Sequence, residues 1–386
     1  MAEWKECTIS DIGTVIGGAT PSTKESENYE DGQIPWITPK DLSTFSGRYI
    51  SRGDRNITKV GLKSCSTQLL PAHSVLFSSR APIGYVAIAQ NEVCTNQGFK
   101  SVVPNENTDY LFLYYLLKYN KETIEHMGSG TTFKEVSGNT MKGIHVKVPV
   151  SIEEQRRIAG VLDALDTKIE ANEKINKNLE QQAQAIYQQM FIDNVGSDWT
   201  EGILSDIADI TMGQSPSGSS YNEYGNGAVF FQGRAEFGFR FPTVRLFTTE
   251  PKRMACSNDT LMSVRAPVGD LNVAHTDCCI GRGLAAIHSK NKHQSFVLYT
   301  MFSLKKQLDI FNGEGTVFGS INRISLNEMP ILIPSNEKLD EFEAIVAPMD
   351  ATIRNNYDEI CYLEQLRDTL LPKLMSGELD ISTLDL

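Results

Sequence analysis

The sequence lacks any hydrophobic run long enough to cross a membrane. No stretch of 18 apolar residues occurs in its 386 residues, and the polar N-terminus has no apolar signal-peptide core. Seven cysteines are scattered along the chain without a CxxC pair that would suggest zinc or a redox centre. We therefore expect a cytoplasmic protein that does not enter a membrane. With 40% hydrophobic residues, it can form two or three folded domains.

Recognisable catalytic motifs are also absent. The sequence contains no P-loop GxxxxGK[ST], no HExxH, no GxSxG and no Asn/Asp-Pro-Pro-aromatic loop of amino-methyltransferases. Its six histidines are dispersed, and they predict no metal or acid–base site. We therefore expect no catalytic residues and no bound metal or cofactor. A nuclease or methyltransferase that works alone is disfavoured.

The net charge of −12 would argue against a polyanionic ligand if it were evenly spread. It is uneven, because residues 1–150 are neutral overall and residues 194–334 carry only −1. Residues 151–193 carry −3 and residues 335–386 carry −8. The two larger bodies therefore remain able to bind a polyanion such as DNA.

An internal repeat organises the chain. Its first part recurs with a shift of 195 residues and its later part with a shift of 185. The matches include Trp4 with Trp199, Pro21-Ser22 with Pro216-Ser217, Arg80-Ala81-Pro82 with Arg265-Ala266-Pro267, and Leu113-Tyr114 with Leu298-Tyr299. So many matches in order indicate a tandem duplication.

The two copies differ in one segment, between about residues 37 and 75 of the first copy. Thr38 through Pro71 shares little with Gln232 through Asn258, and the second copy is ten residues shorter here. We call these stretches the differing segments. A shared scaffold with one differing segment suggests two copies that do the same job on different targets.

Each copy ends in a predicted long helix. Ser151 and Glu154 form a capping-box pattern at the start of the first helix, and Pro372 should kink or end the second helix. Apolar residues follow at steps of three and four, with asparagines between them, as in a coiled coil whose register is fixed by buried amides. The residues predicted to pair the helices are Leu162, Leu165, Ile169, Asn172, Leu179, Ile186, Met349, Ile353, Asn356, Ile360, Leu363 and Leu370.

These patterns predict an α+β fold of two tandem pseudo-symmetric repeats. Each repeat is a mixed, sheet-rich globular body followed by a long helix, and the two helices pair as an antiparallel coiled coil. The predicted divisions are residues 1–150 and 194–334 for the globular bodies, 151–193 and 335–377 for the long helices, and 378–386 for a C-terminal tail.

Basic and polar residues are concentrated in the differing segments. Lysine and arginine can neutralise phosphates, while arginine and glutamine can read base edges in the major groove. A solvated, salt-bridged loop region is the alternative. The candidates for DNA contact are Thr38, Lys40, Arg48, Arg52, Arg55, Lys59 and Lys63 in the first copy, and Gln232, Arg234, Arg240, Arg245 and Arg253 in the second.

Arg80 and Arg265 occupy identical Arg-Ala-Pro turns of the shared scaffold. Each could anchor a DNA phosphate, or could brace its turn by hydrogen bonds to carbonyls. Two glycine-containing stretches, residues 130–134 and 315–318, could present hydroxyls and backbone N–H groups to nucleic acid. A tight turn before the last strand is the more economical interpretation of these stretches.

Several apolar residues lie off the predicted helix seam. They could bind helices of another protein, or they could pack onto the globular bodies of their own chain. These residues are Val161, Ile175, Tyr187, Ile345, Tyr357 and Leu366.

The whole chain resembles the specificity (S) subunits of type I restriction–modification systems, the HsdS family. The likeness follows the family order of recognition domain, long helix, recognition domain and long helix, although Leu339-Asp340-Glu341 replaces the Glu-Gln-Arg start at the second helix. It is carried by Trp4 with Ile9-Ser10-Asp11-Ile12, Arg80-Ala81-Pro82-Ile83-Gly84, Asn96-Gln97-Gly98, Val148-Pro149 with Glu153-Glu154-Gln155-Arg156-Arg157-Ile158, and Leu370 through Leu379.

The resemblance implies a non-catalytic subunit that reads a bipartite, asymmetric site in double-stranded DNA. Its helices would bind two methyltransferase (M) subunits and set the gap between half-sites, and restriction/translocase (R) subunits would join the complex. S-adenosylmethionine, ATP and Mg²⁺ would be bound by the partners. The competing hypothesis is a duplicated protein-interaction scaffold that does not bind DNA.

Overall fold

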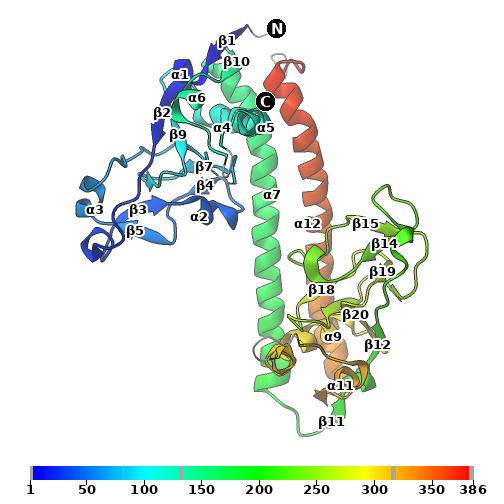
Figure 1. The fold of residues 1–386 in the computed structure, drawn as a ribbon. Helices are drawn as coiled ribbons and strands as arrows, with labels where there is room; N and C mark the ends of the chain where they lie inside the picture. The colour runs from blue at the N-terminus through cyan, green and yellow to red at the C-terminus, as the bar shows by residue number, and fades with distance from the viewer. Residues whose placement is uncertain (1–2, 81, 131–133, 314–318, 382–386) are drawn as a thin grey trace. The chain divides into compact units, whose positions relative to one another are not determined.

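The computed structural model describes residues 3–80, 82–130, 134–313 and 319–381. The chain divides into two compact units (Figure 1), Met1–Asn172 with Glu359–Leu386, and Glu173–Asp358. Both long helices, α7 (Ile152–Tyr187) and α12 (Asn336–Ser376), contribute residues to both units. The division by compactness therefore differs from the division by sequence, which treats each helix as a separate segment.

The strands of the first unit form three small sheets. An antiparallel pair joins the two ends of the globular body, β1 (Trp4–Thr8) with β10 (His145–Pro149). The largest sheet has the order β2 (Gly13–Gly17), β9 (Lys100–Pro104), β6 (Val75–Phe77), β7 (Val86–Ala89) and β4 (Tyr49–Ile50). The third sheet has the order β5 (Arg55–Ile57), β3 (Ile34–Ile37) and β8 (Cys94–Thr95), with β3 and β8 parallel.

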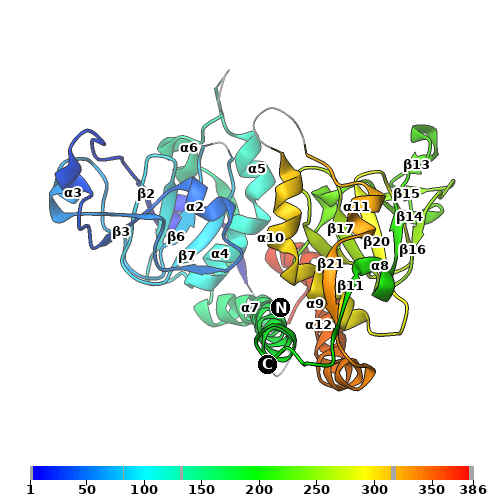
Figure 2. The same cartoon turned by 90° about the horizontal axis from the view of Figure 1, so that it is seen from below.

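One apolar helix covers the largest sheet of the first unit. Helix α4 (Tyr110–Tyr119) begins at its N-cap Asp109, whose carboxylate accepts hydrogen bonds from the Leu111 and Phe112 amides. It packs on β6 and β7 (Figure 2), and six consecutive residues of the helix are buried. The shorter helices are α1 (Ile9–Ile12), η1 (Ser26–Asn28), α2 (Pro39–Ser43), α3 (Lys59–Lys63), α5 (Lys121–His126) and α6 (Gly138–Lys142).

The strands of the second unit repeat this arrangement. The closing pair is β11 (Thr200–Ile203) with β21 (Pro330–Ile333), and one sheet has the order β12 (Ala208–Met212), β20 (Leu284–Ser289), β17 (Thr260–Ser263) and β18 (Leu271–Val273). The other sheet has the order β13 (Tyr221–Asn222), β15 (Leu246–Thr248), β14 (Ala228–Phe231), β19 (Cys278–Ile280) and β16 (Met254–Ala255). Strands β14 and β19 are parallel, as β3 and β8 are in the first unit.

Helix α9 (Gln294–Ser303) takes the place of α4, with seven buried residues packed against β17 and β20. The shorter helices of this unit are α8 (Leu204–Ile207), η3 (Gly218–Ser220), η4 (Arg234–Glu236), α10 (Lys305–Leu308), η5 (Asp309–Asn312) and α11 (Arg323–Asn327). The predicted duplication and the predicted α+β class are therefore confirmed.

The register of the repeat within these helices differs from the sequence prediction by one residue. The sequence match pairs Tyr114 with Tyr299, but the contacts match Tyr299 with Tyr115. The Tyr115 hydroxyl donates to Asp166 at 2.7 Å, and the Tyr299 hydroxyl donates to Asp350 at 2.9 Å. Since tyrosine and aspartate are 51 residues apart in both units, the shift here is 184. Two neighbouring tyrosines in α4 made the sequence match ambiguous.

The long helices pack antiparallel within each unit. In the first unit, Arg367 contacts Asp166 while Glu359 contacts Asn172, so residue numbers rise along one helix as they fall along the other. In the second unit, Asn176 bonds to Asn356, and the rings of Tyr187 and Phe342 lie 5.9 Å apart. Helix α7 begins directly after Ser151 and continues as a π-helix over Gln188–Asp193. Helix α12 ends four residues after Pro372, as expected for a proline near its last turns.

Candidate nucleic-acid interface

The differing segment of the first unit is held by a local cap. Thr38 precedes α2, and its hydroxyl and amide both donate to Asp41 Oδ2 at 2.7 Å. Asp41 also accepts the amide of Asp54 at 2.8 Å, which ties α2 to the residue that precedes β5. Thr38 is half-buried, and its hydroxyl and amide are both used in the capping box at the start of α2.

Five of the six basic residues of this segment are exposed. Lys40 lies 3.8 Å from Asp54, and the Arg55 guanidinium lies over the Tyr29 ring at 4.1 Å. The exposed residues are Lys40, Arg52, Arg55, Lys59 and Lys63. Because Asp41 and Asp54 are the acidic residues between positions 40 and 63, these five leave the segment with excess positive charge toward solvent.

Arg48 is the sixth basic residue, and it is buried. Its side chain is 7% exposed and forms ion pairs with Asp163 and Glu170 of α7, the latter at 2.9 Å. Burial opposes the charge, but the bonds to Glu170 and the nearby Asp163 outweigh it and raise the pKa of Arg48. The donors of Arg48 fasten the segment to α7 in this structure, and its contact with DNA stays an untested prediction.

The differing segment of the second unit presents fewer free cations. Arg234 forms an ion pair with Asp270, and the Arg245 guanidinium lies 2.7 Å from Glu236. Gln232 and Arg253 are exposed. Phe239 is 46% exposed, while Phe241 is buried. This surface is therefore less basic and more aromatic than the corresponding surface of the first unit.

Arg240 in this segment is buried like Arg48. Its guanidinium lies 3.3 Å from both Glu180 of α7 and Asp350 of α12, and 3.0 Å from the Tyr299 hydroxyl. Burial lowers the pKa of Arg240, but the tyrosine oxygen and the two carboxylates outweigh this effect and raise it. Arg240 therefore fastens its segment to both long helices, and its contact with DNA stays an untested prediction as for Arg48.

Arg48 and Arg240 are equivalent although their sequences do not align. The carbonyl of Arg48 accepts the amide of Ile88 at 2.7 Å, and the carbonyl of Arg240 accepts the amide of Val273 at 2.8 Å. Ile88 in β7 and Val273 in β18 match with the shift of 185. We call Arg48 and Arg240 the anchor arginines. Sequence reasoning missed their role for two reasons. The carboxylate partners of Arg48 lie more than 100 residues away along the chain. Those of Arg240 lie on two different helices.

The two Arg-Ala-Pro turns differ in their partners. Arg80 pairs with Glu135 at 3.0 Å, and Arg265 has Ser320 at the place of Glu135 in the matching backbone bridge. Burial raises the pKa of Glu135, but its bonds to Arg80 and Lys100 outweigh this effect and lower it. Arg80 is therefore partly neutralised, whereas Arg265 is exposed and has an uncharged residue, Ser320, at the matching place. Residues 131–133 and 314–318, which carry most of the predicted glycine-containing stretches, lie outside the described residues.

The predicted helix-pairing residues are either buried or half-buried. The buried ones are Leu162, Ile169 and Asn172 of α7 and Ile353 of α12. Half-buried positions are Leu165, Leu179, Ile186, Met349, Asn356, Ile360, Leu363 and Leu370.

The off-seam apolar residues are divided between the two alternatives. Tyr187 is buried in the second core, Tyr357 packs against that core, and Val161 packs against the first core. Ile175 and Ile345 remain 46% and 44% exposed, and Leu366 is half-buried. Part of this set therefore serves its own recognition domains.

Two absences complete the description of the site. Among the described residues, no group of three or more histidine, cysteine or carboxylate side chains could hold a metal ion. No helix within the described ranges combines the length and apolarity that a membrane span requires.

Comparison with known proteins agrees with this architecture. A family model described as the type I restriction modification DNA specificity domain matches residues 1–181 and 196–361. The MjaIX specificity subunit of Methanocaldococcus jannaschii is 33% identical over 99% of this chain and 95% of its own length. The EcoR124I/EcoR124II specificity subunit of Escherichia coli is 34% identical over 43% of this chain and 41% of its own.

A solved structure supports the fold. The S subunit of a type I restriction–modification system from M. genitalium covers 97% of this chain and 96% of its own, with a TM-score of 0.66 and 17% identity. Two matched domains, a full-length relative and a shared fold therefore agree. The chain belongs to the family of type I restriction–modification specificity subunits, whose members recognise DNA sequence and are not themselves catalysts.

Proposed function

We propose that each unit reads one half of a bipartite, asymmetric site in double-stranded DNA through its differing segment. The observation that carries this proposal is the combination of one topology with two different basic segments. Each segment is fastened by a buried anchor arginine, while its remaining cations face solvent. A rigid scaffold that presents a variable polar surface suits base recognition, because phosphate contacts fix position and variable side chains choose the sequence.

The long helices would serve the assembly of the complex. We infer that they bind two methyltransferase subunits and determine the number of base pairs between the half-sites, and that restriction/translocase subunits join through these partners. The exposed Ile175 and Ile345 supply apolar surface for such contacts. S-adenosylmethionine, ATP and Mg²⁺ would be bound by the partner subunits, and the acidic helices would leave tight DNA binding to the complete complex.

An exchange of the first differing segment tests the proposal. Residues 37–75 are replaced by those of a relative with another specificity, with arginine kept at position 48 so that the ion pairs with α7 persist. Methylated adenines are then mapped in DNA from cells that express the complete system. One half-site should change, while the other half-site and the gap stay the same.

Two outcomes would contradict the proposal. Methylation at the original bipartite site after the exchange would show that the segment does not choose the bases. A complete complex that binds all sequences equally would favour the protein-interaction scaffold. The matched control exchanges residues 232–258 with Arg240 kept, and it should change only the other half-site.

A further inference from the structure

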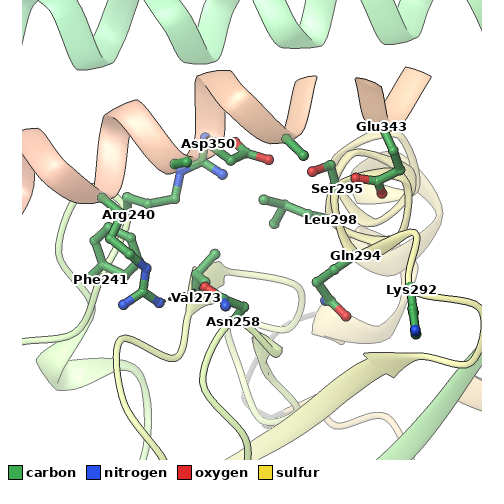
Figure 3. A pocket seen from close by; sticks show the side chains of 13 residues that line it. Arg240, Phe241, Asn258, Val273, Lys292, Gln294, Ser295, Leu298, Glu343 and Asp350 are labelled. Atoms are coloured by element: carbon green, nitrogen blue, oxygen red, sulfur yellow. Dashed lines mark hydrogen bonds and ion pairs between the residues drawn. The ribbon is translucent and has the colours of Figure 1, made fainter. Parts of the chain in front are cut away.

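A cavity of about 310 Å³ lies inside the second unit, where the differing segment faces α9 and α12 (Figure 3). Its lining mixes apolar and charged side chains from three parts of the unit. Arg240 and Phe241 come from the segment, Leu298 from α9 and Asp350 from α12. Figure 3 shows Arg240 and Phe241 on one side of the opening and Leu298 and Gln294 on the other. A small organic molecule fits a space of this size and composition.

The first unit fills the equivalent space with a tyrosine ring. Tyr110, the first residue of α4, stacks on His73 with 4.2 Å between ring centres and 8° between ring planes. Its hydroxyl lies 3.5 Å from that of Tyr49. Tyr49 follows the anchor arginine directly, as Phe241 does in the second unit.

In the second unit a glutamine, Gln294, stands at the place of Tyr110, and the Phe241 ring packs instead against His275 and Tyr357, with 5.2 and 4.9 Å between ring centres. Gln294, the first residue of α9, turns its amide toward the sheet, where it accepts the Ser289 amide at 2.8 Å and donates to the Ile287 carbonyl at 3.1 Å. His73 is replaced by Asn258, and both residues have a left-handed backbone, with φ of 67° and 74°.

Further small residues enlarge the space. With the shift of 184, Leu111 of the first unit becomes Ser295, while Asp163 and Thr167 become Ala347 and Ala351. The cavity therefore results from several smaller side chains together, and not from the loss of the tyrosine ring alone.

Polar donors of the cavity lining lack partners. Arg240 Nε and Nη1 are buried and have no hydrogen-bond partner among the described residues, although the side chain is 4% exposed. Leaving such buried donors unpaired is costly. Burial also raises the pKa of the carboxyl groups of Glu343 and Asp350, both of which line the cavity. The lining therefore offers apolar walls beside donors that an oxygen atom of a ligand would satisfy after a small shift of the Arg240 side chain, because Nε and Nη1 have almost no accessible surface as they stand.

We propose that this cavity binds a small planar aromatic molecule that carries a hydroxyl group, with its ring between Phe241 and Leu298 and its oxygen accepting a hydrogen bond from Arg240. Such a ligand replaces in the second unit the ring that Tyr110 supplies in the first. Because Arg240 and Phe241 belong to the differing segment, the ligand stabilises that segment against α9 and α12. The cavity thus links a small molecule to the surface proposed to read DNA.

The test uses p-cresol, which has the ring and hydroxyl of a tyrosine side chain. The 386-residue chain is titrated with p-cresol, and binding is followed by ligand-observed NMR and by the melting temperature. One molecule should bind per chain, with a dissociation constant of about 1 mM, as expected for so few atoms. Ser295→Leu, which restores the residue of the first unit, should weaken binding at least about ten-fold.

Two further variants distinguish the cavity from nonspecific binding. Ser303→Leu places the same change on the last residue of α9, outside the cavity lining, and should leave affinity unchanged. Tyr110→Gln removes the ring of the first unit but leaves Leu111, Asp163 and Thr167 in place, and should leave the stoichiometry at one. The proposal is overturned if the unaltered protein does not bind p-cresol at 10 mM (about ten dissociation constants), or if Ser295→Leu binds it as well as the unaltered protein does.

Discussion

The two units have an equivalent aspartate on a long helix, but the arginine that pairs with it comes from a different part of the chain in each unit. Asp166 and Asp350 are equivalent, and each accepts the hydroxyl of a tyrosine from the covering helix. In the first unit the arginine beside this aspartate is Arg367 of α12, at 2.9 Å. In the second unit it is the anchor arginine Arg240 of the differing segment. Duplication has therefore kept the aspartate and changed the source of its counter-charge.

This difference limits which segments can be exchanged. Arg48 pairs with Asp163 and Glu170, whose equivalents in the second unit are Ala347 and Arg354. Arg354 donates instead to the carbonyl of His275 at 2.7 Å. A first-unit segment moved to the second unit would bring its arginine toward another arginine, and like charges at short range repel each other. The segments are therefore adapted to their own helices as well as to their targets.

The largest expected effect comes from removing the anchor arginine of the second unit. Arg240→Leu leaves Asp350 and Glu180 without their cation, and their side chains are only 23% and 16% exposed. Breaking a buried ion pair costs about 3–5 kcal/mol, so the free energy of unfolding should fall by that amount. Denaturant unfolding of the full chain, followed by probes in each unit, measures the loss.

Arg48→Leu is the matched control for this comparison. Asp163 and Glu170 are 32% and 35% exposed, and water can solvate them when Arg48 is lost. The expected loss is about 1–2 kcal/mol, between the values for exposed and buried pairs. Equal losses in the two variants would contradict the distinction between the two anchors.

A smaller effect is expected from the tyrosine hydroxyls. Tyr299→Phe removes a group that donates to Asp350 and accepts from Arg240, whereas Tyr115→Phe removes a single bond to Asp166. Both changes leave a buried polar partner, which costs about 1–3 kcal/mol. Tyr299→Phe should be the more destabilising, because two charged partners lose a bond. Unfolding of both variants in the same buffer gives the comparison, and a larger loss for Tyr115→Phe would contradict it.

Much of the architecture was predictable from the sequence, because hydrophobic spacing and duplicated motifs are local signals. The long helices followed from the spacing of Leu162, Ile169 and Ile353, and the α+β bodies from short apolar strands. The roles of Arg48 and Arg240 were not predictable, since a basic residue in a polar segment has the same sequence pattern whether it contacts DNA or a distant carboxylate. Only the fold brings Arg48 to Glu170.

The Arg-Ala-Pro turns give a weaker contrast, in DNA binding by the complete complex. If both turns lie near phosphates, Arg265→Ala should weaken binding more than Arg80→Ala, because Glu135 already neutralises part of the Arg80 charge. Loss of one phosphate contact reduces the slope of log K against log salt by about 1. Salt titrations of the two variants at the cognate site measure this slope. Equal slopes for both variants would contradict the contrast.

The smallest expected effect is the response of the two units to mild acid. Burial raises the pKa of Glu343 and Asp350 above their ordinary values of 4.5 and 3.8. Such a group destabilises the folded state at neutral pH, and this penalty disappears as the pH falls through the raised pKa toward the ordinary value.

Glu135 in the first unit behaves in the opposite way. Burial opposes the shift, but Arg80 lowers its pKa below 4.5, so its stabilisation is present above 4.5 and is lost as the pH falls through the lowered pKa. As the pH falls from neutral toward 4.5, the second unit should therefore gain protection relative to the first, by less than about 1 kcal/mol. Hydrogen exchange of each unit, corrected for the intrinsic pH dependence, measures this difference. The prediction is wrong if the second unit loses protection over this range while the first does not. That result would mean that Arg240 and the other partners fully stabilise the charged form of the buried carboxyl groups.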